Sequence, residues 1–208
     1  MTPSIYSLFV LGAVLTCILT PLIRYFALQK GFVDCPQRAR KVHEQATPRL
    51  GGAAILTSYL GVLLVGGVFI PQLREMLWGE NPFGGYILIG AVAIFVIGIL
   101  DDLSRLFPKT KLVGEFLVAA IVVSGARFSF TEVQFLGLGT ISFPESLGFA
   151  LACLWIVGMA NAINLIDGLD GLASGITLMG LLAVSVVGYL AGITSVTWFA
   201  TLLIGCLL

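Results

Sequence analysis

The chain consists of long apolar segments separated by short polar ones. The apolar segments are continuous, and about 20 consecutive apolar residues are enough for a helix to cross a bilayer. A β-barrel would instead need segments of about ten residues with alternating hydrophobicity. The pattern therefore predicts an all-α, polytopic membrane protein with a single integral membrane domain over residues 1–208. Seven spans are expected, at residues 5–28, 51–70, 83–100, 112–126, 146–163, 172–190 and 193–208.

Composition agrees with this pattern, because 58% of the residues are hydrophobic, against about 45–50% in soluble domains. The first apolar segment lacks the basic flank of a signal peptide and is too long for one, so we expect it to stay as a span. The four cysteines show no CxxC spacing, which argues against a zinc site.

The distribution of cations predicts the orientation. If the spans alternate, the polar segments 29–50, 101–111 and 161–171 share one face of the membrane, and 71–82 and 127–145 share the other. Nine of the 11 Lys and Arg residues then fall on or beside the first face. By the positive-inside rule this face is cytoplasmic and the N-terminus lies outside.

An acid pair, Asp101 and Asp102, directly follows the apolar segment 83–100. Charged groups at membrane depth cost about 2.5–3.5 kcal/mol on insertion scales and are functional candidates. A single Asp there would more often be a helix cap or a solvated loop residue. Two adjacent carboxylates repel each other and favour a cation or a raised pKa. Carboxylate oxygens also suit Mg²⁺, although the dipeptide alone does not decide the matter.

A second polar cluster interrupts otherwise apolar sequence after the fifth predicted span. Asn161, Asn164 and Asp167 recur every third residue and would share one face of a helix. Asp170 continues the spacing, and Gly168 permits a tight backbone. A cap and turn between two spans would need fewer polar residues, so we expect this stripe to line a polar cavity.

Cations lie on the same predicted face of the membrane as both clusters. Arg49 is part of a rigid Pro-Arg-Leu-Gly-Gly segment, residues 48–52, that a simple lipid-binding basic loop would not explain. Lys111 could be an ordinary positive-inside charge, or it could hold a phosphate opposite the acid pair. Carboxylates, amides and cations on one face indicate metal-dependent phosphoryl transfer at the membrane surface, with one lipid and one soluble substrate.

Four segments in this order carry a resemblance to a known family. They are PRLGG (48–52), GILDD (98–102), KTKL (109–112) and NAINLIDGLDGL (161–172). Together they resemble the polyprenyl-phosphate N-acetylhexosamine-1-phosphate transferases of the glycosyltransferase 4 family. The PRLGG segment is closer to the WecA/TagO-like branch than to the MraY-like one. The resemblance covers the chain from about residue 34 to residue 208.

The resemblance implies an activity. A member of this family would transfer N-acetylglucosamine 1-phosphate from UDP-GlcNAc to undecaprenyl phosphate and release UMP, with Mg²⁺, or Mn²⁺, as cofactor. The product would begin a cell-envelope glycan such as teichoic acid or lipopolysaccharide at the bacterial plasma membrane. The partners implied are the lipid phosphate, the UDP-sugar and a second copy in a homodimer, and no nucleic acid.

The resemblance also implies roles for single residues. Asp101 would prepare the lipid phosphate, Asp102 would support the site and the metal, and Lys111 would hold the pyrophosphate. Asn164 would bind the metal together with Asp102. Substrate-binding residues would be Arg49, Asn161, Asp167, Gly168, Leu169 and Asp170.

Two departures from the family pattern stand out. Glu115 occupies a position where relatives often have Gln. The family's downstream metal-binding Asp and sugar-recognising His-rich loop are not in this sequence. Members have about ten or eleven spans, so we expect a truncated chain that is inactive by itself. The alternatives are a transporter or ion-conducting protein, which would place acids at mid-span, and a non-catalytic scaffold.

Overall fold

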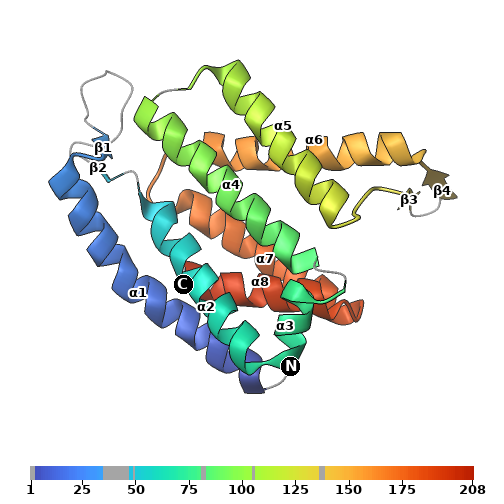
Figure 1. Ribbon diagram of the computed structural model, residues 1–208, viewed down its shortest axis with the longest axis horizontal. Coiled ribbons are helices and arrows are strands. Elements are labelled where there is room, and N and C mark those ends of the chain that lie inside the picture. The colour runs from blue at the N-terminus through green and yellow to red at the C-terminus, as the bar shows by residue number, and fades with distance from the viewer. Residues whose placement is uncertain (1–2, 35–46, 49, 81–82, 105, 136–138) are drawn as a thin grey trace. The chain divides into compact units, whose positions relative to one another are not determined.

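The computed structural model describes residues 3–34, 47–48, 50–80, 83–104, 106–135 and 139–208 (Figure 1). Its helices are α1 (Pro3–Lys30), α2 (Gly51–Phe69), α3 (Pro71–Trp78), α4 (Phe83–Ser104), α5 (Pro108–Gly125), α6 (Glu145–Ile166), α7 (Leu172–Leu190) and α8 (Thr194–Leu207). The strands β1 (Val33–Asp34) and β2 (Thr47–Pro48) form one antiparallel pair, and β3 (Glu132–Phe135) and β4 (Gly139–Ser142) form another.

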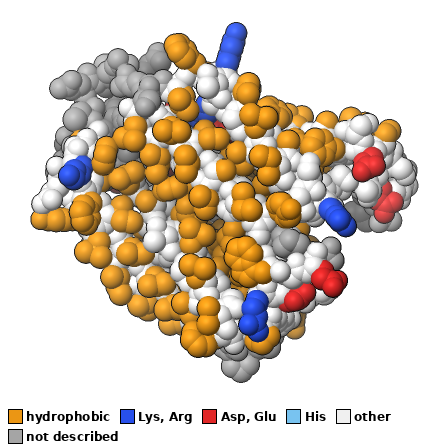
Figure 2. Space-filling view, viewed as in Figure 1, with side chains coloured by type: hydrophobic (Ala, Val, Ile, Leu, Met, Phe, Trp, Pro, Cys, Tyr) orange, Lys and Arg blue, Asp and Glu red, His pale blue; other side chains and the backbone are white. Residues whose placement is uncertain are grey.

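Membrane-length helices dominate the described part of the chain, which confirms the predicted all-α, polytopic membrane class. Five of them, α1, α2, α4, α6 and α7, are long and apolar enough to cross a bilayer. Helix α5 has 18 residues but carries three charged side chains, and α8 has 14 residues. Helices α5 and α8 correspond to the predicted spans at residues 112–126 and 193–208. Hydrophobic side chains cover most of the face of the helices shown in Figure 2.

Two elements differ from those expected. Helix α4 continues through Asp101 and Asp102 to Ser104, so the acids belong to its last turn and do not follow it. The connection 71–82, predicted as a loop, contains α3, which begins at Pro71. Proline is favoured at the first helical position, because its missing N–H has no helical partner there. Within the polar segment 127–145, β3 and β4 form an antiparallel pair.

The chain divides into two compact units, and the first comprises Met1–Met76 and Ile166–Leu208. In this unit α8 packs against α1, α2 and α7. The Tyr59 hydroxyl of α2 donates to the Phe199 carbonyl of α8 at 3.1 Å. The Ser185 and Thr201 hydroxyls join α7 to α8 at 2.8 Å. Each bond supplies a partner to a hydroxyl that the surrounding apolar side chains cannot satisfy.

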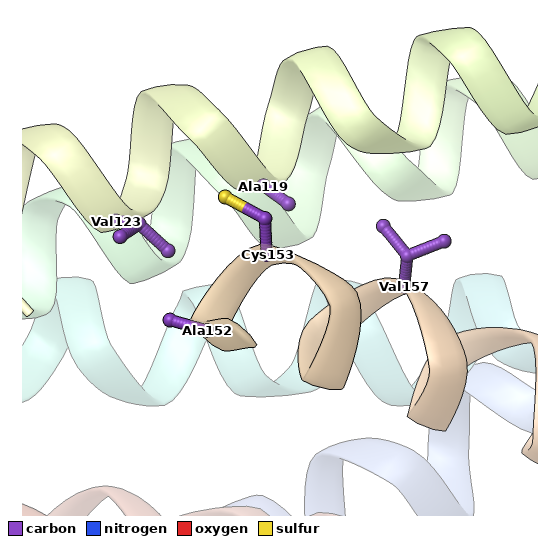
Figure 3. Close-up of a cluster of buried hydrophobic side chains, with 5 residues drawn as sticks. All are labelled: Ala119, Val123, Ala152, Cys153 and Val157. Carbon is purple, nitrogen blue, oxygen red and sulfur yellow. The ribbon is translucent and has the colours of Figure 1, made fainter. Parts of the chain in front are cut away.

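The second unit, Leu77–Leu165, contains α4, α5 and most of α6. Helices α5 and α6 meet through small and branched apolar side chains (Figure 3). These buried residues are Ala119, Val123, Ala152, Cys153 and Val157. Helix α4 packs on α5 where a Cβ at Gly125 would lie 2.2 Å from the Tyr86 ring. Small residues of this kind allow helix backbones to approach closely in membrane proteins. The close packing positions α5 between α4 and α6.

The contact of α1 with α8 gives a test of the packing. A Cβ at Gly205 would lie 2.5 Å from the Phe9 carbonyl oxygen, which belongs to rigid backbone. Gly205→Ala should therefore separate the two helices and destabilise the protein by about 1–3 kcal/mol. The unfolding temperature in detergent micelles measures this loss.

Gly180→Ala is the matched control, because a Cβ at that position in α7 meets no atom within 4 Å. Alanine should be neutral or stabilise the helix there by up to about 1 kcal/mol. Equal unfolding temperatures for the two variants would contradict the close α1–α8 contact.

Candidate functional site

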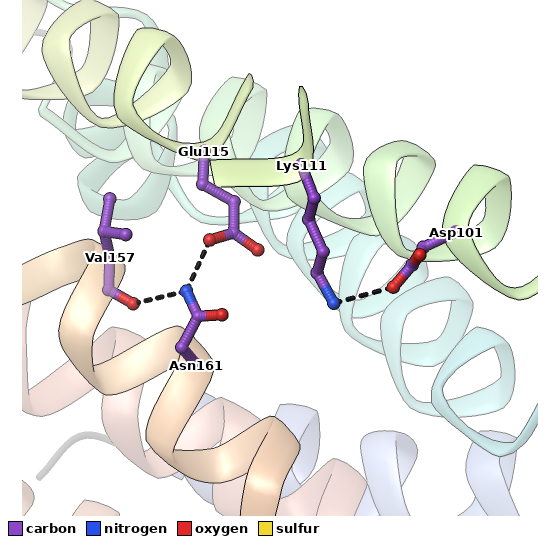
Figure 4. A network of polar contacts seen from close by, with 5 residues as sticks. All are labelled: Asp101, Lys111, Glu115, Val157 and Asn161. Atoms are coloured by element: carbon purple, nitrogen blue, oxygen red, sulfur yellow. Dashed lines mark hydrogen bonds and ion pairs between the residues drawn. The ribbon is translucent and has the colours of Figure 1, made fainter. Parts of the chain in front are cut away.

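An ion pair joins the end of α4 to the beginning of α5. The Lys111 ammonium lies 2.8 Å from Asp101 Oδ2 (Figure 4), and the two side chains are 17% and 29% exposed. The bond is charge-assisted, and such bonds are stronger than those between neutral groups. Pro108 begins α5 three residues before Lys111 and sets the direction in which the new helix leaves the turn. One anionic and one cationic group therefore lie side by side where the apolar part of α4 ends.

A second polar contact joins α5 to α6 one helical turn further on. Glu115 is only 4% exposed, and its carboxylate accepts a hydrogen bond from the Asn161 side-chain nitrogen. The same nitrogen donates to the Val157 carbonyl at 2.9 Å, as Figure 4 shows. Lys111 and Glu115 are four residues apart and so lie on one face of α5. That face presents a cation to α4 and an anion to α6.

Glu115 is the site residue to which sequence reasoning assigns no role. In the sequence it stands out only as a departure from the family pattern. Two features of the sequence indicate a functional role for Glu115. It is a charged residue inside an apolar helix, and it lies four residues from Lys111. Its partner Asn161 is 46 residues away in the chain, and no local pattern links the two positions.

The predicted Asn/Asp stripe is only partly helical. Asn161 and Asn164 lie in α6, Asn161 partly buried and Asn164 exposed. The helix ends at Ile166, so Asp167 is not on a helical face and the predicted continuation of the stripe is wrong. The backbone turns at this point because the Gly168 N–H bonds to the Ile166 carbonyl at 2.7 Å.

The connection between α6 and α7 is an exposed turn in the first unit. It contains four of the predicted substrate-binding residues, Asp167, Gly168, Leu169 and Asp170. The Leu172 N–H bonds to the Leu169 carbonyl at 3.1 Å, and Gly171 has φ 77° and ψ −5°. These angles match the third position of a type II turn, which requires a positive φ and so favours glycine. The exposed turn carries two carboxylates, Asp167 and Asp170.

The remaining predicted site residues are placed as follows. Asp102 lies in the last turn of α4 and is exposed. Arg49 lies outside the described residues. The structure therefore brings together Asp101 with Lys111 and Asn161 with Glu115. The turn 167–170 belongs to the other unit.

The donor set gives limited support to a metal. Within the described ranges, no three His, Cys, Asp or Glu side chains are grouped closely enough to hold a metal ion. Asp102 and Asn164 offer the hard oxygen atoms that Mg²⁺ prefers, and Mg²⁺ commonly binds through one or two carboxylates plus substrate phosphates. The side chains described here therefore do not by themselves form a metal site.

These structural features define a class of protein. It is a helical membrane protein with a polar site of carboxylates, amide and ammonium at the end of its membrane-length helices. A model of "Glycosyl transferase family 4" matches residues 85–208. The chain belongs to this family, and the resemblance drawn from the four sequence segments is confirmed.

Individual relatives are similar over most of this chain. It is 37% identical over 189 residues to a probable undecaprenyl-phosphate N-acetylglucosaminyl 1-phosphate transferase of Bacillus subtilis, covering 88% of this chain and 48% of the relative. It is 35% identical to a decaprenyl-phosphate N-acetylglucosaminephosphotransferase of Mycobacterium tuberculosis, covering 83% and 42%. A phospho-N-acetylmuramoyl-pentapeptide-transferase of Staphylococcus saprophyticus is 27% identical, covering 98% and 66%. The chain spans about half the length of the first two relatives.

The α6–α7 turn gives a second stability test. Gly171→Ala should lower the free energy of unfolding by about 1–2 kcal/mol, because an L-residue is strained at the positive φ of this position. A Cβ there meets no atom within 4 Å, so the loss would come from the backbone alone. Chemical denaturation in detergent measures it.

Gly168→Ala serves as the control, because Gly168 also lies in open space but does not have a positive φ. It should change the stability little. A loss as large as that of Gly171→Ala would contradict the type II turn.

Proposed function

We propose that the complete protein transfers a sugar 1-phosphate from a UDP-sugar to undecaprenyl phosphate and releases UMP. N-acetylglucosamine is the sugar proposed, since it appears in the names of the first two relatives. The observation that carries the proposal is the Asp101–Lys111 ion pair at the end of a membrane-length helix, in a chain of glycosyl transferase family 4.

The location of the ion pair suits a lipid phosphate. Helix α4 is apolar from Phe83 to Leu100, and its polar residues begin at Asp101. A polyprenyl chain would lie beside the apolar part, and its phosphate would reach the level of the polar residues. There the Lys111 ammonium can exchange the Asp101 carboxylate for a phosphate oxygen, because both are anionic oxygen acceptors for the same donor.

The reaction balances with these groups. An oxygen of the lipid phosphate forms a bond to the β-phosphorus of the UDP-sugar. The bond between that phosphorus and the bridging oxygen breaks, and UMP leaves with the electron pair. Asp101 would accept the proton of the lipid phosphate where one is present, and Lys111 would neutralise charge on the pyrophosphate. Catalysis of phosphoryl transfer consists mainly of such positioning and charge neutralisation.

The other predicted residues keep the roles that the family resemblance implies. Asp167, Gly168, Leu169 and Asp170 would bind the nucleotide through their exposed turn. Arg49 would contact substrate, an assignment that rests on its sequence segment alone. Mg²⁺, or Mn²⁺, would be held partly by Asp102 and Asn164 and would reduce the negative charge of the phosphates.

We place the site on the cytoplasmic face of a bacterial plasma membrane, with the N-terminus outside. The excess of Lys and Arg in segments 29–50 and 101–111 supports this orientation. A homodimer stays a prediction. The transporter alternative gains no support, since Asp101 and Asp102 lie in the last turn of α4 and Asp167 and Asp170 lie between helices.

Asp101→Asn tests the role of the acid. The amide oxygen can still accept from Lys111, so the fold should persist, but the group can no longer take a proton. Transfer of labelled N-acetylglucosamine 1-phosphate from UDP-GlcNAc to undecaprenyl phosphate should fall roughly 10²–10⁴-fold. Glu132→Gln, an exposed acid on β3, should keep wild-type turnover. Near-normal transfer by Asp101→Asn would contradict the assignment.

Removal of divalent cations tests the cofactor. Excess EDTA should abolish transfer by the complete protein, and added Mg²⁺ should restore it, because the phosphates need a counter-charge in the transition state. Turnover that persists in EDTA would remove the metal from the proposal and leave the ion pair as the source of positive charge.

A further inference from the structure

The side-chain amide of Asn161 has a fixed orientation. An asparagine side chain offers two N–H donors on nitrogen and one acceptor oxygen. Its nitrogen contacts two groups at once, the Glu115 carboxylate and the Val157 carbonyl. A carbonyl can only accept a hydrogen bond, so an amide turned the other way would place Oδ1 against two acceptor oxygens. The two neighbours therefore decide which way the amide faces.

Both N–H donors of Asn161 are used within the protein. Figure 4 shows Oδ1 on the far side of the amide from Val157, and the nitrogen is the atom directed towards the Glu115 carboxylate. The atom left for a ligand is therefore an acceptor. A ligand that meets Asn161 must bring a cation or an N–H or O–H donor, and a phosphate oxygen does not suit it.

Glu115 is the group that makes this orientation obligatory. Bonding to Val157 is a local contact within α6, for which water or a ligand can compete. Glu115 comes from a different helix and is buried, so its carboxylate needs a donor and finds it at Asn161. A small apolar residue would pack α5 against α6 without this requirement, as Ala119 does one turn further along.

We infer that Glu115 is a positioning residue that turns Asn161 so that its carbonyl oxygen faces the ligand, and that Asn161 acts as an acceptor. The inference rests on the proposed function for what the ligand is: a divalent cation or a donor group of the sugar nucleotide. It assigns Glu115 no contact with substrate. Helix α5 then positions both halves of the site, Lys111 towards α4 and Glu115 towards α6.

An exchange of the two side chains tests the inference in the complete protein. Four proteins are compared: wild type, Glu115→Gln, Asn161→Asp and the double variant Glu115→Gln/Asn161→Asp. The double variant keeps one carboxylate and one amide at the contact and reverses which helix carries each. The amide from α5 now donates, and the carboxylate on α6 keeps an acceptor oxygen for the ligand. Glu145→Gln, an exposed acid at the start of α6, is the control for the substitution itself.

The expected order of transfer rates follows from donors and acceptors. Glu115→Gln should lower the transfer rate by about three- to tenfold, because its amide can either accept from Asn161 or donate to it and so no longer enforces one orientation. Asn161→Asp should lower the transfer rate roughly a hundredfold or more, because it places two carboxylates together. The double variant should recover at least about tenfold over Asn161→Asp. Recovery would be partial, because the Val157 carbonyl still opposes the introduced carboxylate.

Two results would overturn the inference. If Glu115→Gln loses as much as Asn161→Asp, the carboxylate itself takes part in the reaction. If the double variant is as inactive as Asn161→Asp although it folds, Asn161 serves as a donor to its ligand.

The unfolding temperatures of the same four proteins separate this inference from the proposed function. Asn161→Asp should unfold at the lowest temperature, and the double variant should regain part of the loss. A double variant no more stable than Asn161→Asp would overturn the pairing. A wild-type protein that transfers no sugar phosphate would defeat the proposed function, while the unfolding temperatures would still decide the pairing.

Discussion

A polar side chain that is buried between membrane helices has no water to bond, and this constraint accounts for the buried hydrogen bonds that join the helices. Tyr59 bonds to a carbonyl of α8, Ser185 bonds to Thr201, and Glu115 bonds to Asn161. Each of these contacts joins two helices and gives a polar side chain a partner outside its own helix. The same requirement that holds helices together also fixes the directions of side chains at the candidate site. Packing and site geometry therefore have one physical origin.

Small residues make these contacts reachable. Gly205 brings α8 against the backbone of α1, and Gly125 brings α5 against the Tyr86 ring of α4. In lipid the apolar side chains gain little from meeting one another, so close van der Waals packing and hydrogen bonds have a large share in helix association. A larger residue at Gly125 would move α4 and α5 apart and lengthen the Asp101–Lys111 contact between them. Within the second unit, Gly125 thus helps to set the dimensions of the site.

The sequence predicted the helical membrane class well, because continuous apolar segments of about 20 residues are typical of helices that cross a bilayer. It misplaced the ends of α4 and α6, because hydrophobicity marks where the bilayer ends and not where the helical hydrogen bonds end. Asp101 therefore lies in a helix and Asp167 outside one. Four ordered segments were enough to indicate the family. The Glu115–Asn161 contact escaped prediction, because it depends on how α5 and α6 pack, which no periodicity within either helix encodes.

Helix α5 makes its two polar contacts from a single face, and this has a consequence for how the chain tolerates length changes. Successive residues of an α-helix are rotated by about 100°. One residue inserted between Lys111 and Glu115 would turn the rest of α5 by that angle, so that Asp101 and Asn161 could not both keep their partners. A substitution in this short stretch changes one side chain and leaves the other contact in place. An insertion or deletion would break one of the two contacts. We therefore expect the spacing between these two residues to be under tighter constraint than the length of the β3–β4 hairpin.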